Sequence, residues 1–227
     1  MLYGKTNKAP LTFNKLLLTE EQKGRYKNPD NDHKGSWVSS DFTARGIRPN
    51  QLYGITTPSG KIYYPPEGKC WQNTEDGFLR QLKEGRFYFG VKGDSVPRRK
   101  NYLNETDGRI PWSWWSNSEV GHSQEGKMDI SKIFGKYETF STPKTVRLLS
   151  RICNISTKNN SIILDYFAGS GTTGHSVINL NREDNGKRKY ILVEMGEYFD
   201  SVTKPRIQKV IYSDIWKEGK PTTKNGV

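Results

Sequence analysis

The chain has 227 residues, which allows one large domain or one compact domain with an irregular partner. Only 33% of its residues are hydrophobic and 26% are charged, yet six Trp and twelve Tyr argue against a disordered chain. No apolar run approaches the roughly 18 residues that a membrane span needs. The N-terminal residues also lack the pattern of a secretory signal, so we expect a cytoplasmic protein without a membrane partner.

The cysteines argue against a metal site, and the net charge favours an anionic partner. Cys70 and Cys153 lie far apart and the three histidines are scattered, so no metal site is expected. The net charge is +12, and the stretches 1–140 and 141–227 each contribute +6. A basic excess spread over a folded protein favours a polyanionic partner, most commonly nucleic acid, although simple solubility is the alternative.

Residues 1–140 are rich in turns and in aromatic side chains. Gly, Pro, Asn and Asp interrupt this stretch about every ten residues, and KIYY, RFYFGV and IPWSWW lie between the breaks. Such runs predict short strands and hairpins on an irregular α+β scaffold. Because loops on a scaffold often bind partners, this region is a candidate for recognition.

From residue 141 the pattern changes to alternating helices and strands. Thr142 and Pro143 are suited to begin a helix that continues to about residue 155. SIILDYF and KRKYILVE are apolar runs typical of strands buried on both faces, with HSVINLN as a helix between them. EYFDSVTKPRIQKVIY is predicted to be helical on both sides of Pro205. This βαβ order predicts an α/β fold with part of a doubly wound parallel sheet.

The motif DYFAGSGTTG, at residues 165–174, carries the chemistry. The first strand ends at Asp165, and Gly169 and Gly171 allow a tight turn whose backbone a ligand can approach. The next helix begins near Thr172, so its unpaired N–H groups would stabilise an anionic ligand group. Glu194 ends the second strand, where an acidic residue can accept hydrogen bonds from a ribose. The motif therefore predicts a nucleotide-type ligand.

Dinucleotide-binding proteins also use this glycine spacing, so NAD is one alternative. A dinucleotide-binding domain opens with this turn and needs further strands after it. Only 56 residues follow Gly171, and residues 1–140 do not alternate strand and helix. NAD therefore fits the chain less well.

The motif DYFAGSGTTGH resembles the cofactor motif of adenine-specific DNA methyltransferases, closest to the modification subunits of type III restriction–modification systems. FSTPKTVRLLSRI and KRKYILVEMGEYFDSVTKPRIQKVIY are similar to the same family, as is RYKNPDNDHKGSWVSSDFTAR, so the resemblance runs through most of the chain. It implies S-adenosylmethionine (SAM) as cofactor, DNA as partner and methylation of the exocyclic amine of adenine.

The resemblance also implies roles for parts of the chain. Residues 1–140 would correspond to the target-recognition region, and residues 141–227 to the SAM-binding portion of the methyltransferase domain. The family usually has Lys-Pro where this chain has Lys144-Thr145, which departs from the pattern at that turn. The residues implied to bind SAM are Lys144, Asp165, Phe167, Gly169, Gly171, Thr172 and Glu194.

The family's catalytic motif, Asp-Pro-Pro-Tyr or a close variant, does not occur in these 227 residues. The single Pro-Pro, at Pro65-Pro66, lies between Tyr64 and Glu67 and reads as a rigid turn. The chain therefore resembles the C-terminal portion of the family and is expected to be inactive alone. Its expected partners are a companion chain with the catalytic half, a restriction subunit or a second copy of itself. The alternative is a DNA-recognition subunit without catalysis.

Two clusters are candidates for DNA contact. Arg98, Arg99 and Lys100 form the densest basic cluster of the first region and would contact phosphates, unless they lie in a solvated loop. Trp114, with its neighbouring tryptophans, would stack on a displaced base or wedge the duplex, unless it packs inside the region. His122 and His175 have no partner motif for catalysis and are expected to be structural.

Overall fold

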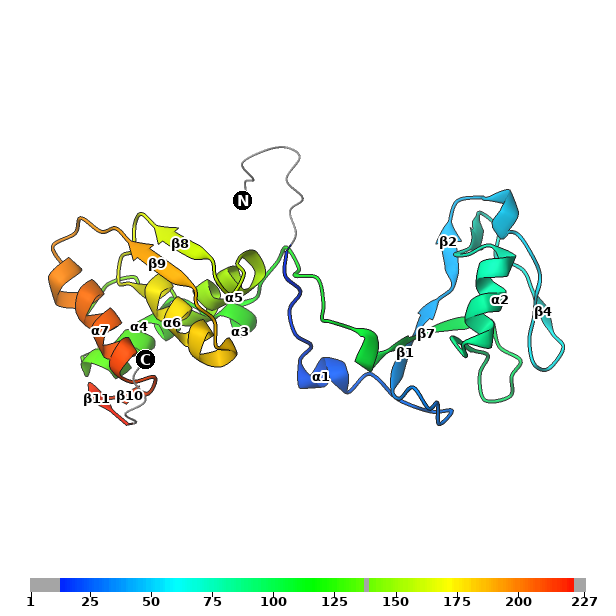
Figure 1. The fold of residues 1–227 in the computed structure, drawn as a ribbon, viewed down its shortest axis with the longest axis horizontal. Helices are drawn as coiled ribbons and strands as arrows, with labels where there is room; N and C mark the ends of the chain where they lie inside the picture. The colour runs from blue at the N-terminus through cyan, green and yellow to red at the C-terminus, as the bar shows by residue number, and fades with distance from the viewer. Residues whose placement is uncertain (1–12, 137–138, 223–227) are drawn as a thin grey trace. The chain divides into compact units, whose positions relative to one another are not determined.

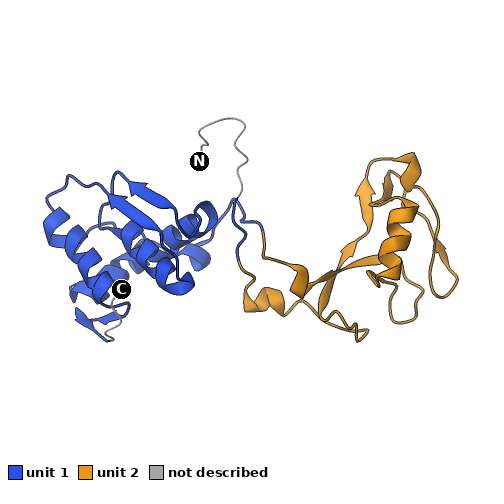
Figure 2. Ribbon diagram, in the orientation of Figure 1, with its two compact units in different colours: residues 1–16, 110–227 blue, residues 17–109 orange. Residues whose placement is uncertain are grey.

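The computed structural model describes residues 13–136 and 139–222 of a mixed α/β chain (Figure 1). The chain divides into two compact units, unit 1 of residues 1–16 and 110–227 and unit 2 of residues 17–109 (Figure 2). Within the described residues, no helix is long and apolar enough to cross a membrane.

The division between the units does not fall at the predicted boundary after residue 140. Residues 110–140 belong to unit 1, because helix α4 (Ser123–Phe134) packs against helix α7 (Lys204–Tyr212) and the C-terminal hairpin. Lys209 of α7 donates a hydrogen bond of 2.8 Å to the carbonyl of Ile133. The change of sequence texture near residue 141 therefore does not mark the edge of a compact body.

Unit 2 consists of short strands and short helices, of which α2 is the longest helix. Strands β1 (Trp37–Asp41), β7 (Arg98–Tyr102) and β6 (Phe87–Tyr88) form an antiparallel sheet in the order β1-β7-β6. The other strands and helices are α1 (Glu20–Lys23), β2 (Thr43–Arg45), β3 (Ile55–Thr56), β4 (Ile62–Tyr63), β5 (Lys69–Trp71), α2 (Glu75–Lys83) and two 3-10 helices, η1 (Pro49–Gln51) and η2 (Leu103–Glu105). β2 pairs with β5 and β3 with β4, both antiparallel. Short strands are present as predicted, and β3–β4 is a short hairpin, whereas β2 and β5 pair across a long stretch of chain.

Aromatic side chains hold unit 2 together. Six residues form its core, namely Phe42, Ile55, Trp71, Phe78, Phe87 and Phe89. Phe42 contacts Phe87 edge to face with ring centroids 4.6 Å apart, and the Trp71 indole donates to the Tyr53 carbonyl at 2.8 Å. Aromatic rings bury large areas for few ordered residues, which suits a body of such short elements.

Unit 1 contains the predicted βαβ unit. Strand β8 (Ile162–Asp165), helix α6 (Thr172–Asp184) and strand β9 (Lys189–Leu192) follow one another, and the two strands pair in parallel. A π-helix (Phe199–Thr203) leads into α7, so the chain is helical on both sides of Pro205 as predicted. The other elements are α3 (Asn117–Val120), α5 (Val146–Ser156), β10 (Trp216–Lys217) and β11 (Lys220–Pro221).

One face of the β8–β9 pair is covered and the other is exposed. Ile163 and Tyr190 pack against Cys153, Val177 and Leu180 of α5 and α6. The side chains that point the other way are exposed, namely Ile162 (66%), Leu164 (46%), Ile191 (52%) and Val193 (38%). The prediction that both faces are buried is therefore wrong for this chain, because no described segment covers the second face.

Three other expectations need correction. The helix predicted from Pro143 begins at Val146, because Thr145 is its N-cap and accepts the Leu148 N–H at 3.2 Å. The IPWSWW run forms no strand, and the described part of residues 1–140 contains four α-helices that we did not predict, of which α2 and α4 are the longest. Helices α2 and α4 were not predicted because each contains a glycine, a residue that usually indicates a turn or the end of a helix.

Candidate cofactor-binding site

Asp165 holds the loop between β8 and α6 in place. Asp165, the last residue of β8, accepts hydrogen bonds from the Phe167 N–H at 3.1 Å and the Thr173 hydroxyl at 2.5 Å. The loop is also tied to β9, because the Ala168 N–H donates to the Val193 carbonyl at 3.1 Å. These contacts fix the turn that carries the glycines.

The glycines of the loop serve different purposes. Gly169 and Gly171 have φ values of +53° and +79°, in the region that side chains rarely adopt. A Cβ on Gly169 would point toward Phe140, at 3.7 Å, whereas a Cβ on Gly171 would meet the Thr203 carbonyl at 3.4 Å. Gly174 has an ordinary φ, but a Cβ there would lie 2.7 Å from Ile207. Gly171 is thus needed for the turn and Gly174 for close packing.

A cavity of about 280 Å³ lies over this loop. Five of the seven residues predicted to bind the cofactor line it, namely Lys144, Asp165, Phe167, Gly169 and Thr172. Gly171 is not among the lining residues, and a Cβ on it would face Thr203 and Ile207 instead. The first turn of α6 opens onto the cavity at Thr172 and Thr173. Its backbone N–H groups have no partner within the helix, so the end of the helix is positively polarised.

Glu194 holds the loop from a position two residues beyond the end of β9, rather than ending that strand as predicted. Its two carboxylate oxygens accept the N–H groups of Gly196 at 2.8 Å and Gly169 at 2.7 Å. These two backbone hydrogen bonds lower the pKa of Glu194, so its carboxylate stays charged at neutral pH. Its predicted contact with a ribose stays a prediction, and the structure adds a second role in shaping the loop.

The opposite wall of the cavity is the extended segment Thr142–Lys144. A Cβ on Gly126 of α4 would lie 2.4 Å from the Pro143 carbonyl, so this segment can approach α4 only because residue 126 is glycine. The Thr172 hydroxyl donates to the Lys144 carbonyl at 3.2 Å. The segment is thus fixed on both sides, and the Thr-Pro-Lys sequence forms a wall rather than a helix start.

Sequence reasoning missed several residues of the site. Phe140, Leu149, Ala168, Ser170 and Thr173 also line the cavity. Position next to the glycine motif could have identified Ala168, Ser170 and Thr173. No sequence signal identified Phe140 and Leu149, because only the tertiary fold brings the Thr-Pro-Lys segment against the loop.

Lys100 does not serve as the predicted phosphate contact. Its side chain is buried in unit 2, and its ammonium lies 2.5 Å from Asp30 and 2.6 Å from Asp32. Burial opposes the charged form, but the bonds to both carboxylates outweigh it and raise the pKa of Lys100. The Tyr102 hydroxyl donates to Asp32 at 2.7 Å. The cluster is an internal ion-pair network, so its lysine is not available to DNA.

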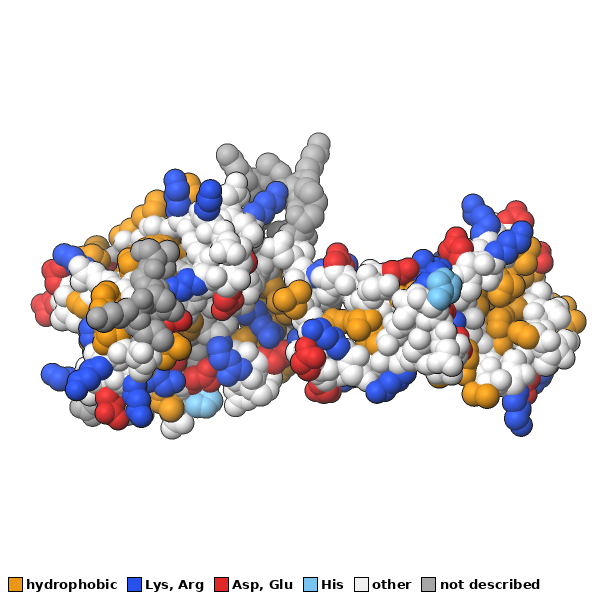
Figure 3. Space-filling view, turned by 60° about the horizontal axis from the view of Figure 1, so that its bottom comes forward, with side chains coloured by type: hydrophobic (Ala, Val, Ile, Leu, Met, Phe, Trp, Pro, Cys, Tyr) orange, Lys and Arg blue, Asp and Glu red, His pale blue; other side chains and the backbone are white. Residues whose placement is uncertain are grey.

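Arg98 and Arg99 lie on strand β7 rather than in a loop. Arg98 is exposed and donates to the Ser39 hydroxyl at 3.1 Å, while Arg99 is half-buried. On the face drawn in Figure 3, Lys and Arg side chains are interspersed with Asp and Glu. Arg98 therefore remains the most accessible of the three predicted phosphate contacts.

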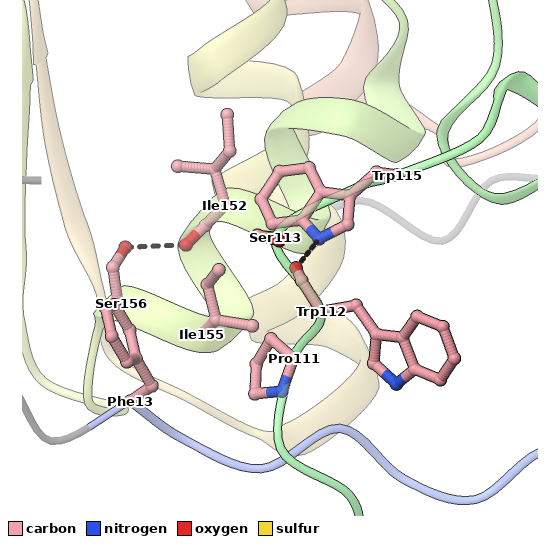
Figure 4. Close-up of a pocket in the computed structure, with 8 residues that line it drawn as sticks. All are labelled: Phe13, Pro111, Trp112, Ser113, Trp115, Ile152, Ile155 and Ser156. Atoms are coloured by element: carbon pink, nitrogen blue, oxygen red, sulfur yellow. Dashed lines mark hydrogen bonds between the residues drawn. The ribbon is translucent and has the colours of Figure 1, made fainter. Parts of the chain in front are cut away.

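Trp114 belongs to unit 1 and is 80% exposed, so the alternative that it packs inside the region is wrong for this residue. Its neighbours border an apolar pocket of about 570 Å³ against helix α5 (Figure 4). The Trp115 indole donates to the Trp112 carbonyl at 2.8 Å and lies near Ile152, whereas the Trp112 ring projects outward. The rings of Trp112 and Trp115 thus point in different directions.

The expected structural role of His175 agrees with its surroundings. It is buried in α6, and its Nδ1 lies 3.2 Å from the Arg206 guanidinium. Burial and the neighbouring positive charge lower the pKa of His175, so the ring is neutral. His122 is exposed and precedes α4 as its N-cap residue. Among the residues that the structure describes, no group of three potential metal ligands occurs.

A glycine loop at the carboxyl end of a parallel strand pair defines a nucleotide-type site, and comparison with known proteins specifies the class. The family described as DNA methylase matches residues 3–204, so the chain belongs to that family. The chain is 32% identical to the Mod subunit of the type III restriction–modification enzyme StyLTI of Salmonella typhimurium, over 89% of its own length.

Other relatives support the same assignment. The type II methyltransferase M.KpnI of Klebsiella pneumoniae is 42% identical over 68% of this chain. The Mod subunit of the type III enzyme EcoP15I of Escherichia coli is 26% identical over 76% of the chain. The predicted resemblance to type III modification subunits is confirmed. The chain spans 30%, 39% and 26% of the lengths of these three relatives, so it corresponds to part of such a protein.

Proposed function

We propose that this chain is the cofactor-binding and DNA-recognition part of a methyltransferase that transfers a methyl group from SAM to the exocyclic amine of adenine in DNA. The observation that carries the proposal is the cavity over the glycine loop, at the carboxyl end of β8 and β9. Open α/β sheets bind their ligands at this end of the strands. The DNA substrate implies a cytoplasmic location.

The residues around the cavity fit the chemistry of SAM. The positively polarised end of α6, at Thr172 and Thr173, suits the carboxylate of the methionine part. We propose that Glu194, charged at neutral pH and bonded to the loop at Gly169, also accepts hydrogen bonds from the ribose hydroxyls. Phe140 and Phe167 provide apolar walls, and the Phe167 side chain is 85% exposed. Burial of that ring would be one gain on binding.

In the proposed reaction, the exocyclic amine of adenine would accept the methyl group of the bound donor and lose one proton, and the donor would leave as the neutral thioether. SAM supplies the electrophilic methyl group. The chain contributes position, because its loop, its helix end and the Pro143 segment would hold the donor in one orientation. No residue of this chain is proposed to be catalytic.

The exposed face of the β8–β9 pair supports the presence of a further segment. Parallel sheets are normally covered on both faces, and Ile162, Leu164, Ile191 and Val193 form an apolar surface on the uncovered one. We propose that a catalytic half with the Asp-Pro-Pro-Tyr motif covers this face and extends the pair into a doubly wound sheet. That half would belong to a longer protein or to a companion chain, and a restriction subunit is a further proposed partner.

Unit 2, residues 17–109, is the proposed target-recognition body. This proposal replaces the longer region, residues 1–140, that the sequence resemblance implied. The accessible cation of unit 2 at Arg98 and the exposed Trp114 of unit 1 are the proposed DNA contacts. Phosphate contacts of this kind give affinity that falls steeply with salt. A non-catalytic recognition subunit would bind DNA without needing the SAM cavity.

Calorimetric titration with SAM tests the cofactor assignment, with NAD as the negative control. We expect saturable binding of SAM alone. Gly169→Asp should abolish it, because the carboxylate would lie on the cavity side of the loop. Gly60→Asp is the matched control, since Gly60 also has a positive φ but lies in an exposed turn of unit 2 with nothing nearby. Binding of NAD, or equal SAM binding by both variants, would contradict the assignment.

A filter assay with methyl-labelled SAM and adenine-containing DNA tests the missing catalytic half. The chain alone should transfer no label. Transfer by the purified chain would show that it contains the whole catalytic machinery, and the proposed division would then be wrong.

A further inference from the structure

A buried arginine supports the glycine loop from behind. Arg206 of α7 has no exposed surface. One guanidinium nitrogen donates to the Ser170 carbonyl at 3.2 Å and to the hydroxyls of Ser170 and Thr172, both at 2.9 Å. The other lies 3.2 Å from His175 Nδ1. All three partner residues belong to the loop or to the first turn of α6.

The contacts of Arg206 extend to the opposite wall of the cavity. The Thr172 hydroxyl, which accepts from Arg206, donates to the Lys144 carbonyl at 3.2 Å. From the same helical segment, the Thr203 hydroxyl donates to the Gly169 carbonyl at 2.6 Å. One side chain therefore connects the loop, the helix end and the segment that face each other across the cavity.

The burial of this guanidinium is costly to the fold. Burial lowers the pKa of Arg206 to about 10, so the group is still charged at neutral pH. Among the described residues, no carboxylate lies within 4.0 Å of it, and its Nε has no hydrogen-bond partner. An apolar side chain would fill the same space without the cost of removing a charge from water. What the guanidinium adds is directed hydrogen bonding to the loop.

We propose that Arg206 is a positioning residue that holds the glycine loop in its ligand-binding shape before the cofactor arrives. The identity of that cofactor as SAM rests on the proposed function, whereas the support of the loop does not. Arg206 touches no atom that would react, so it acts through Ser170, Thr172 and His175.

Arg188 provides a matched control within unit 1. It is also buried, but its guanidinium pairs with Asp184 at 2.8 Å and with the Asn159 side chain at 3.1 Å. None of these residues lines the cavity. Arg188→Met therefore removes a buried arginine without touching the loop, whereas Arg206→Met removes the proposed support.

Hydrogen–deuterium exchange of the full chain, without ligand, tests the support directly. Arg206→Met should speed exchange of the amides in residues 168–173 by about tenfold or more relative to Arg188→Met, the equivalent of losing one or two hydrogen bonds. Arg206→Lys should give an intermediate effect, because lysine keeps the charge but lacks the planar fork. SAM affinity should fall in the same order.

The outcomes separate this inference from the proposed function. Equal exchange in residues 168–173 of the Arg206→Met and Arg188→Met proteins would overturn it, as would faster exchange spread evenly over unit 1. If Arg206→Met does not fold, the comparison of Arg206→Lys with Arg188→Lys decides in the same way. Absence of SAM binding by the unmodified chain would contradict the proposed function, while the exchange result would still decide the role of Arg206.

Discussion

The two loop glycines should respond differently to the same substitution. Alanine at Gly169 or Gly171 places a side chain at a φ of +53° or +79°, which costs roughly 1–2 kcal/mol. Neither methyl group meets an atom closer than 3.4 Å, so packing adds little to this cost. Each variant should therefore shift the unfolding equilibrium of unit 1 by about 5- to 30-fold. Only Gly169→Ala should also weaken SAM binding sterically, because its Cβ points toward Phe140 in the cavity wall.

Urea titration followed by hydrogen exchange in peptides from each unit measures both quantities. The midpoint of unit 1 should fall with an unchanged dependence on urea, and that of unit 2 should not move. Gly60→Ala, with a φ of +87°, is the control and should shift only unit 2. If Gly171→Ala weakens SAM binding more than Gly169→Ala at equal stability, our account of the loop is wrong.

Three further substitutions test other parts of the account. Gly174→Val should destabilise unit 1 by about 1–3 kcal/mol in a thermal melt, because its Cβ would lie 2.7 Å from a side-chain carbon; an unchanged melting temperature would refute this. Lys100→Met should cost unit 2 about 3–5 kcal/mol, since it leaves Asp30 and Asp32 unpaired, and a neutral effect would contradict the ion-pair network. Trp114→Ala should change stability by less than about 0.5 kcal/mol but weaken DNA binding, which fluorescence anisotropy measures.

The acid sensitivity of unit 2 follows from the same cluster. Bonds from Lys100, the Lys34 N–H and Tyr102 outweigh the effect of burial and hold the pKa of Asp32 well below its usual range. A depressed folded-state pKa stabilises the fold above the ordinary value near 4, and this stabilisation is lost as the pH falls further. Unit 2 should therefore lose stability below about pH 4, and urea midpoints between pH 3 and 6 would show it. A flat profile would contradict the network.

Local pattern was enough to predict the βαβ unit and most of the cavity. The apolar runs near Asp165 and Glu194 form strands at the predicted positions. A short apolar run and a glycine turn each depend on only a few neighbouring residues, so the local sequence is enough to predict them. The helix start was misplaced by three residues, since Thr145 competes with Thr142 as N-cap and wins through its tertiary bond to the Val120 carbonyl.

Features that depend on tertiary structure could not be predicted. Lys100 and Asp32 are far apart in sequence, and nothing local distinguishes a buried lysine from a surface one. Nothing in the sequence of α7 distinguishes Arg206 from Lys204 and Lys209, yet Arg206 is the residue that donates to the loop. The exposure of the second face of β8 and β9 could not be predicted either, because an apolar run does not indicate which segment, if any, packs against each face of the strand.

Titration of the ¹⁵N-labelled chain with SAM, followed by amide chemical shifts, tests the central claim most directly. We predict saturable shifts confined to residues 140–149 and 165–173, which contribute the lining of the cavity over the glycine loop, and to residues 194–196, where Glu194 holds that loop. Shifts centred on the apolar pocket beside Trp115, or none that saturate, would contradict the claim that this chain holds the methyl donor.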